Sequence, residues 1–209
     1  MTDYIPSSSK SFVQQEISKL KDENESLQSE VRSLRQFVLS LDRLYNVADS
    51  FQDDSQLFPF LKGTLANAMK LLNAPDGSLA LLDEESQELV FVIVVGQLSD
   101  SLTNHRLSLN EGIAGWVVRN GKPALVPDVR RDPRFFSGVD DTFTFKTQSI
   151  AAAPLMGANR KTFGIIEILN QPGSEPFNNN DLGLLKLLCR AAGEALAFID
   201  QMPRDKEKK

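Results

Sequence analysis

Apolar residues recur at alternating steps of three and four along the first quarter of the chain. Written as a heptad, the a positions hold mainly β-branched residues and the d positions mainly leucine, at Ile17, Leu20, Asn24, Leu27, Val31, Leu34, Val38 and Leu41. The repeat extends over more than four heptads. Such a pattern is typical of a coiled coil, so it predicts one long helix over residues 13–48.

The same heptads predict how two such helices pair. β-Branched residues at a with leucine at d favour two parallel strands, and two copies of Asn24 fix the register by hydrogen-bonding across the seam. In this arrangement Glu16 faces Lys21 of the partner, which is an attractive pair. We therefore predict a parallel homodimer. The alternative, a helix that folds back on its own domain, fits the last turns, where Phe37 and Leu44 widen the apolar face and the helix runs into the domain.

Beyond residue 50 the pattern changes between helix and strand periods. Further helices are predicted at 56–72, after the capping residues Asp53, Asp54 and Ser55, at 112–118, and at 179–202. Apolar runs predict strands at 78–82, 89–95, 106–109, 124–129, 150–156 and 163–169, with hairpins at the first pair and the last pair. Local hairpins between helices favour an α+β fold on a mainly antiparallel sheet.

Two of these segments carry further detail. The strand at 89–95 is apolar on both faces, with Leu89, Phe91 and Ile93 on one of them, so it must be covered from both sides. Residues 130–148 form the longest irregular segment, and long loops inside compact domains are usually functional or mobile.

Composition and charge exclude several classes of protein. The 209 residues carry a net charge of −5, which gives no electrostatic reason to bind nucleic acid or an anionic membrane, and no apolar run is long enough to span a bilayer. A single cysteine, Cys189, and a single histidine, His105, predict no disulfide and no zinc site. We predict a metal-free cytoplasmic protein with a disordered tail at 1–12 and a charged tail at 203–209.

A series of short motifs gives the globular part a family likeness. They are EGIAGWV from Glu111, GKP from Gly121, VPDV from Val126, DPRF from Asp132, SIAAAPL from Ser149, GIIEILN from Gly164, and the segment 177–185. Together they resemble a GAF domain over residues 40–202. The resemblance implies a six-stranded antiparallel sheet flanked by helices, with a small-molecule pocket on one face. It also implies a regulatory module that binds cyclic nucleotides, other small ligands or tetrapyrroles, or that only dimerises.

The resemblance also allows subtypes to be compared residue by residue. GAF domains that bind cyclic nucleotides often carry Asn-Lys, a spacer, Phe, three residues and Asp-Glu. Here Asn170, Phe177 and Asp181 match, whereas Gln171 and Leu182 replace the Lys and the Glu, so the Lys–Asp salt bridge of that motif cannot form. One cysteine does not supply the disulfide exchange of the methionine-sulfoxide-reducing GAF enzymes. Its place in the last helix also disfavours a covalent chromophore.

The pocket implied by the resemblance has walls from the helix at 113–118, the segment 130–148 and the following strand. Aromatic, basic and small residues there are candidates for ligand binding: Trp116, Arg130, Arg131, Arg134, Phe135, Phe136, Ala152 and Glu167. Arginines beside aromatic rings suit an anionic ring compound such as a nucleotide. The alternatives are that Trp116 belongs to the core, that the arginines face water, and that Ala152 makes room for a closely packed helix.

The sequence contains no nucleophile beside a base, no phosphate-binding glycine loop and no metal set, so we predict that the chain is not an enzyme. The function we expect is a dimeric sensor that binds a non-covalent small molecule and signals through its coiled coil to a downstream protein partner. No other cofactor is expected. The alternative is a ligand-free dimerisation or adaptor protein whose pocket is filled by its own side chains.

Overall fold

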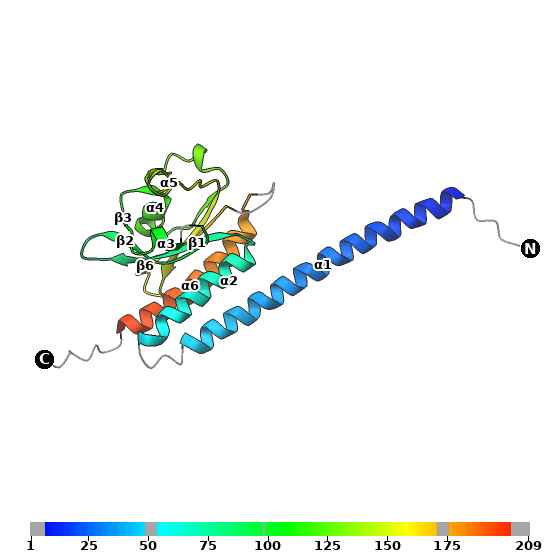
Figure 1. Cartoon of the computed structure of the whole chain (residues 1–209). Helices are drawn as coiled ribbons and strands as arrows, with labels where there is room; N and C mark the ends of the chain where they lie inside the picture. Colours follow the sequence, from blue (N-terminus) through cyan, green and yellow to red (C-terminus); the bar gives the residue numbers. More distant parts are fainter. Residues whose placement is uncertain (1–6, 49–53, 98, 171–175, 202–209) are drawn as a thin grey trace, which may run out of the picture. The chain divides into compact units, whose positions relative to one another are not determined.

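The structure, a computed structural model, describes residues 7–48, 54–97, 99–170 and 176–201 (Figure 1). Its chain divides into two compact units, Met1–Ser40 and Leu41–Lys209. Helix α1 (Ser7–Ala48) begins inside the segment 1–12 for which the sequence predicted a disordered tail. Residues 1–6 and 203–209 lie outside the described residues.

The predicted seam of α1 is an exposed apolar stripe. Its side chains are each between 44% and 61% exposed at Ile17, Leu20, Leu27, Val31, Leu34 and Val38. Asn24 accepts a hydrogen bond from Gln28 on the same helix, Nε2 to Oδ1 at 2.7 Å. The side chain of Leu41, the last predicted seam residue, lies outside the described part of the chain.

Six strands form one sheet in the order β3-β2-β1-β6-β5-β4, and every neighbouring pair is antiparallel. The strands are β1 (Asp76–Asp83), β2 (Glu88–Val95), β3 (Arg106–Ser108), β4 (Ala124–Val126), β5 (Ile150–Met156) and β6 (Thr162–Leu169). The predicted α+β class, the six strands and both hairpins are therefore confirmed. Strand β4 is short and lies at an edge, as Pro127 after it requires.

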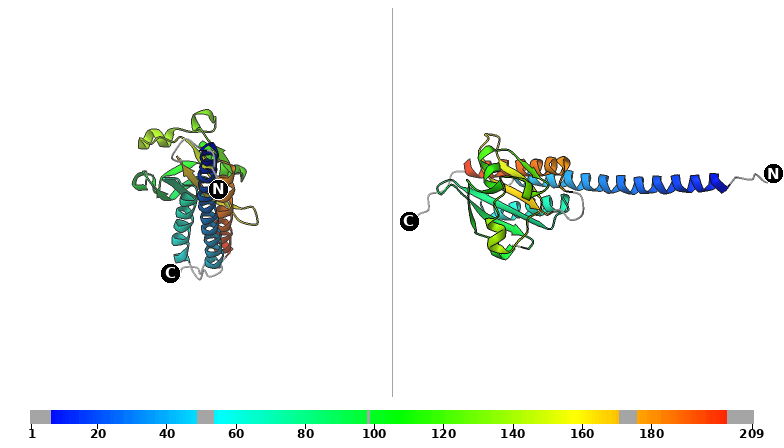
Figure 2. Two further views of the ribbon diagram at one scale, coloured as in Figure 1. Left: turned by 90° about the vertical axis from the view of Figure 1, so that its right-hand side faces the viewer. Right: turned by 90° about the horizontal axis from the view of Figure 1, so that it is seen from above.

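Helices cover both faces of the sheet. Helices α2 (Leu57–Leu71) and α6 (Asn179–Gln201) lie side by side on one face (Figure 1). The other face carries three shorter helices, α3 (Ser99–Leu102), α4 (Gly112–Asn120) and α5 (Gly138–Phe143), and α5 lies on the opposite side of the domain from α2 and α6 (Figure 2). Two 3₁₀ turns, η1 (Asp54–Gln56) and η2 (Val129–Arg131), complete the order. Thus long helices cover one face of the sheet, whereas short helices and irregular segments form a looser cover on the other.

Strand β2 changes face at a bulge. Leu79 of β1 pairs with Ile93, but the next residue, Ala80, pairs with Phe91, so Val92 is an extra residue in β2. An extra residue reverses which face the following side chains occupy. The prediction that Phe91 and Ile93 share a face was therefore wrong, and the alternation restarts after the bulge.

The start of α2 also differs from the expectation. The helix follows the turn η1, and Gln56 at the N-cap position makes no side-chain capping hydrogen bond. Asp53 lies outside the described residues. At the end of α4, by contrast, Gly121 adopts the left-handed conformation (φ 59°) that ends a helix, as predicted.

Candidate ligand-binding cavity

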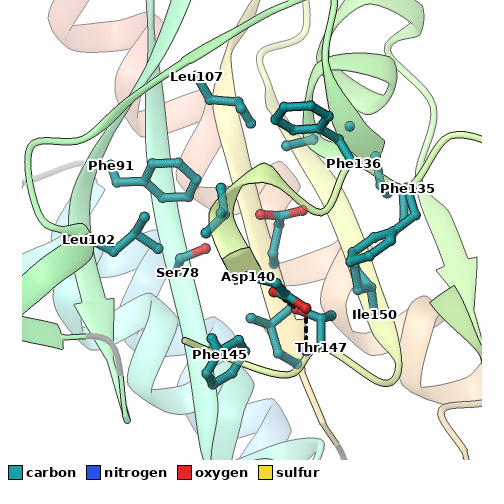
Figure 3. Close-up of a pocket in the computed structure, with 16 residues that line it drawn as sticks. Ser78, Phe91, Leu102, Leu107, Phe135, Phe136, Asp140, Phe145, Thr147 and Ile150 are labelled. Carbon is teal, nitrogen blue, oxygen red and sulfur yellow. Dashed lines mark hydrogen bonds between the residues drawn. The ribbon is translucent and has the colours of Figure 1, made fainter. Parts of the chain in front are cut away.

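A small cavity lies between the sheet and its looser cover. Its walls come from β1, β2 and β6, from the start of α4, and from the segment 130–148, and Figure 3 shows Ser78, Phe91, Phe135, Phe136 and Asp140 around it. The enclosed space is about 70 Å³. That is room for a few water molecules and far less than the ~300 Å³ or more of a typical ligand pocket.

Glu167 is the most unusual group on the lining. It lies in the middle of β6, paired across the sheet with Ser78 on one side and Ala152 on the other. Its side chain is buried, at 8% exposure, among apolar neighbours. Burial raises the pKa of Glu167 to about 7, an effect that the hydrogen bond with Ser78 partly offsets. Near neutral pH this carboxyl group therefore exchanges a proton readily, and it has capacity for a further hydrogen-bond donor.

A second carboxyl group on the lining, Asp140, joins two parts of the segment 130–148 that covers the cavity. It accepts hydrogen bonds from the backbone N of Thr147 at 2.8 Å and from the Thr147 hydroxyl at 2.6 Å. Asn170 holds the end of the same segment, since its Oδ1 accepts from Gln148 N at 2.7 Å and its Nδ2 donates to the Lys146 carbonyl at 3.1 Å. These contacts keep the cover closed in this structure.

The arginines predicted to bind an anion lie off the cavity lining. Arg130 makes a two-point contact with Asp128, with nitrogen–oxygen distances of 2.9 and 3.1 Å, and its side chain is 79% exposed. Arg131 is also exposed and lies 3.6 Å from Asp128. Arg134 contacts Asp132 in the same two-point way, at 2.9 and 2.6 Å. All three guanidinium groups therefore face carboxylates of their own segment.

Two of the three aromatic candidates line the cavity, and the third packs beside it. Phe135 and Phe136 line the cavity, whereas Trp116 packs against the apolar core beside it. The guanidinium carbon of Arg134 lies 4.4 Å from the centre of the Trp116 ring, a cation–π contact. Ala152 is fully buried on the cavity side of β5 without lining the space. Of the eight predicted residues, the structure thus brings Phe135, Phe136 and Glu167 to the cavity.

The three residues that match the cyclic-nucleotide motif have structural contacts away from the lining. Asn170 holds the segment 130–148, and Phe177 is buried at 2% exposure. Asp181 accepts a hydrogen bond from Asn178 N at 2.9 Å, while Asn178 Oδ1 accepts from the backbone N of Asp181 at 3.3 Å. This reciprocal pair caps α6. Gln171 lies outside the described residues.

Sequence reasoning missed three polar residues of the cavity lining, Ser78, Asp140 and Thr147. Ser78 is a buried serine at the start of an otherwise apolar strand, and only the register that sets it opposite Glu167 reveals its position. The sequence alone favours a solvated Asp140, because nothing in it connects this residue to Thr147 seven residues later.

Two other kinds of feature are absent from the part of the chain that the structure describes. Within residues 7–48, 54–97, 99–170 and 176–201, no three His, Cys, Asp or Glu side chains are placed to hold a metal ion together. Among the helices described, none combines the length and apolar character needed to cross a membrane.

The antiparallel sheet carries long helices on one face and the small cavity on the other. The GAF domain family model matches residues 60–197 of the chain. The chain therefore belongs to the GAF domain family, whose members are generally regulatory modules that often bind small molecules.

Similar proteins support the same assignment. The dual 3',5'-cyclic-AMP and -GMP phosphodiesterase 11A of Takifugu rubripes is 26% identical over 156 residues, a match that covers 67% of this chain but only 17% of the phosphodiesterase. The GAF domain of a Coxiella burnetii phosphoenolpyruvate-protein phosphotransferase has a TM-score of 0.65 at 18% identity, covering 78% of this chain and 94% of its own. The free methionine-R-sulfoxide reductase of Neisseria meningitidis gives 0.63 at 18% identity, covering 79% and 90%. These structures show the fold alone.

Proposed function

We propose that this GAF domain is a sensor whose cavity binds a small ring compound carrying a hydrogen-bond donor, such as an amine or a ring N–H. The observation that carries the proposal is Glu167, a carboxyl group buried in a mainly apolar cavity and set opposite Ser78 in the sheet. A buried carboxylate costs free energy unless it is paired, so a donor on the ligand stabilises it.

The charge of the lining is the reason to prefer a donor over the anionic ring compound that the sequence suggested. Two acids, Glu167 and Asp140, line the cavity, and no Lys or Arg belongs to its described lining. Arg130, Arg131 and Arg134 already face Asp128 and Asp132. An anionic group inside would meet carboxyl groups of like charge, whereas a neutral or cationic donor would meet acceptors.

A ligand larger than the cavity of about 70 Å³ requires the segment 130–148, which carries Phe135 and Phe136 of the lining, to move. The contacts of Asp140 with Thr147 order this segment, and Asn170 holds its end. A ligand that binds only the open arrangement shifts the population toward it, which is how binding is transmitted to the rest of the protein.

Thermal denaturation with a panel of metabolites tests the ligand. We expect compounds with an amine or ring N–H to raise the melting temperature of the wild-type chain and to lose most of this effect in Glu167→Gln. Glu85→Gln, an exposed position on the β1–β2 turn, is the matched control and retains the effect. A rise that is equal in wild type and Glu167→Gln contradicts the role of the carboxyl group.

We further propose that α1 pairs in parallel with a second copy and passes the signal to a partner protein. The supporting observation is the exposed stripe of the seam, whose apolar side chains another helix would bury. Leu27→Glu is expected to convert the dimer to a monomer in native mass spectrometry. Ser29→Glu, on the same helix but off the seam, leaves the dimer intact. A monomeric wild type overturns this part of the proposal.

The closed cavity favours a second candidate function, a ligand-free dimerisation or adaptor protein. The observation behind it is the small volume, about 70 Å³, of the cavity that Phe135 and Phe136 line. The two functions differ in one measurement, since native mass spectrometry of the freshly purified sensor shows a co-purified small mass and the adaptor shows none.

A further inference from the structure

A second hollow lies at another part of the same domain and has the opposite charge. It is a groove of about 810 Å³ between the end of α4, the β5–β6 hairpin and α6. Its lining holds five cationic side chains, Arg119, Lys122, Arg160, Lys186 and Arg190, and no carboxylate. The chain as a whole has a net charge of −5, so this concentration of positive charge is local.

The cations of the groove are poorly neutralised. Arg119 donates to the neutral amide of Asn110 at 2.7 Å, which orients the guanidinium group without cancelling its charge. Arg190 lies 3.9 Å from Glu194, a long contact for an ion pair. For the other three, no carboxylate lies within 4.0 Å among the residues that the structure describes. Lys161 on the same hairpin shows the contrast, because it pairs with both Glu84 and Asp200.

Apolar side chains also line the groove. They include Pro123, Pro154 and Met156, the last two from β5, and Met156 lies where Gly193 of α6 comes close to the sheet. Cations beside apolar side chains suit a molecule that combines charged groups with an organic body.

We propose that this groove binds a small organic molecule that carries at least two oxyanion groups, such as phosphates or carboxylates. Like charges held together repel one another, and an anion that reaches several of them relieves the repulsion and accepts their hydrogen bonds. The proposal is independent of the cavity ligand, since none of the groove cations lines the cavity.

The shape of the groove favours a small molecule over an acidic peptide. Its volume, about 810 Å³, falls within the range of ~300–1,000 Å³ typical of small-molecule sites. The cations also come from three separate elements around one hollow, rather than in a row along one helix or strand, which an extended chain would need.

Isothermal titration calorimetry of the full chain at low salt tests the proposal, with tripolyphosphate, ATP and citrate as probes. We expect at least one probe to bind, and the double variant Lys122→Ala/Lys186→Ala to weaken it by about tenfold, as the loss of two charge-assisted contacts implies. The control Lys62→Ala/Lys70→Ala removes the same charge from exposed positions of α2 and changes affinity by less than about twofold. Comparing ATP with citrate distinguishes phosphate from carboxylate as the preferred group.

Three results would overturn the proposal. They are no binding of any probe, equal weakening in the control variant, and tighter binding of a poly-glutamate peptide than of ATP. The last result would assign the groove to an acidic protein segment. The variant Glu167→Gln, which tests the cavity, is expected to bind the same probes as wild type, so failure at one site is distinguishable from failure at the other.

Discussion

The small cavity and the larger groove of this GAF domain contrast in charge and in the burial of their charged side chains. The cavity lies over the central strands β1 and β6, where Glu167 is buried and its pKa is raised. The groove lies where α4 ends, at the β5–β6 hairpin and along α6, and its five cationic side chains are exposed. The domain therefore places a buried acid at the cavity and exposed bases at the groove.

The difference teaches that position in the sheet decides what a charged side chain does. The buried carboxyl group of Glu167 has a pKa of about 7, so its ionisation responds to a donor beside it and to pH near neutrality. Exposed cations stay charged and attract anions without a conformational change, although salt weakens that attraction. The cavity is suited to a change of ionisation state when ligand or pH changes. The groove is suited to electrostatic binding that needs no such change.

The largest expected effect is a loss of stability in Gly193→Ala, a substitution beside the wall of the groove. Gly193 lies in α6, where a Cβ atom would overlap the backbone of Met156 in β5. Because backbone atoms cannot move aside cheaply, we expect a loss of at least ~3 kcal/mol in the free energy of unfolding. Denaturant unfolding followed by circular dichroism measures it.

The matched control lies on the same helix. A Cβ atom added at Gly183 would have no neighbour within 4 Å, so Gly183→Ala is expected to stabilise the helix by roughly 0.5–1 kcal/mol through propensity alone. Equal effects of the two substitutions would show that the close contact between α6 and β5 is not what sets the wall of the groove.

The next largest effect concerns the buried acid of the cavity. The pKa of Glu167, about 7 in the folded chain, exceeds its ordinary value of 4.5, so the folded state binds this proton more tightly than the unfolded state does. Stability from this group is fully present below pH 4.5 and is lost as pH rises toward and through 7. We expect Glu167→Gln to be about 2–3 kcal/mol more stable than wild type at pH 8 and nearly equal to it at about pH 4.5.

Denaturant titrations at these two pH values measure the difference. Glu85→Gln, on the exposed β1–β2 turn, is the control and is expected to follow wild type at both. A gain for Glu167→Gln that does not depend on pH would mean that packing, and not ionisation, distinguishes the two side chains.

Much of the fold was predictable because it depends on local patterns. Alternation and turn residues located all six strands and both hairpins, and helical periodicity located α6. The bulge at Val92 was not predictable. Every residue from Leu89 to Val95 is apolar, so the sequence does not show which of these side chains share a face of the sheet. The start of α1 was missed because the same serines that suit a disordered tail also suit a helix N-terminus.

The candidate site was less predictable, because it depends on contacts between distant segments. Glu167 stands out in the sequence as a polar residue within an apolar strand, but its burial follows from the register with Ser78. The pairing of the arginines does have a local signal. An aspartate stands two positions before Arg130 and before Arg134, close enough for each guanidinium group to face its own segment.

A smaller effect is expected where the cover of the cavity is fastened. Thr147→Val removes the hydroxyl that donates to Asp140, and we expect a loss of about 1 kcal/mol together with faster tryptic cleavage within the segment 130–148. Thr103→Val also removes a threonine hydroxyl bond, to the Ser99 carbonyl in α3, and serves as the control for proteolysis. Unchanged cleavage of Thr147→Val would mean that Asp140 does not hold the cover closed.

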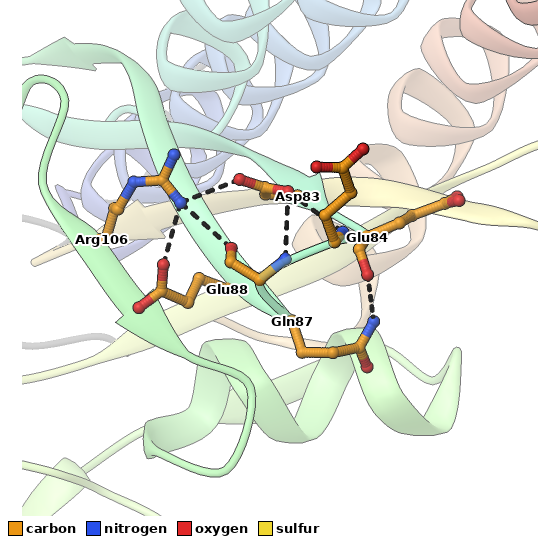
Figure 4. A network of polar contacts seen from close by, with 7 residues as sticks. Asp83, Glu84, Gln87, Glu88 and Arg106 are labelled. Atoms are coloured by element: carbon orange, nitrogen blue, oxygen red, sulfur yellow. Dashed lines mark hydrogen bonds and ion pairs between the residues drawn. The ribbon is translucent and has the colours of Figure 1, made fainter.

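The smallest effect is expected at an exposed acid, Asp83, which is the counterpart of buried Glu167 in this comparison. Arg106 donates to Asp83 at 2.9 Å, to Ser86 at 3.1 Å and to Glu88 at 2.9 Å, and so joins the β1–β2 hairpin to β3 (Figure 4). The hydrogen bond from Arg106 is the main cause that lowers the pKa of Asp83 from 3.8 to about 2.

The sign of its pH dependence is opposite to that of Glu167. Because the folded pKa is lowered, the stability from Asp83 is present above pH 3.8 and is lost as pH falls through about 2. We expect Arg106→Gln to lower the melting temperature slightly at about pH 6 and to converge with wild type near pH 2, with Arg119→Gln as a control outside the hairpin. Solvent screening keeps the effect small. A difference that grows as the solution is acidified would contradict the pairing, because protonation of Asp83 removes the charge that Arg106 contacts.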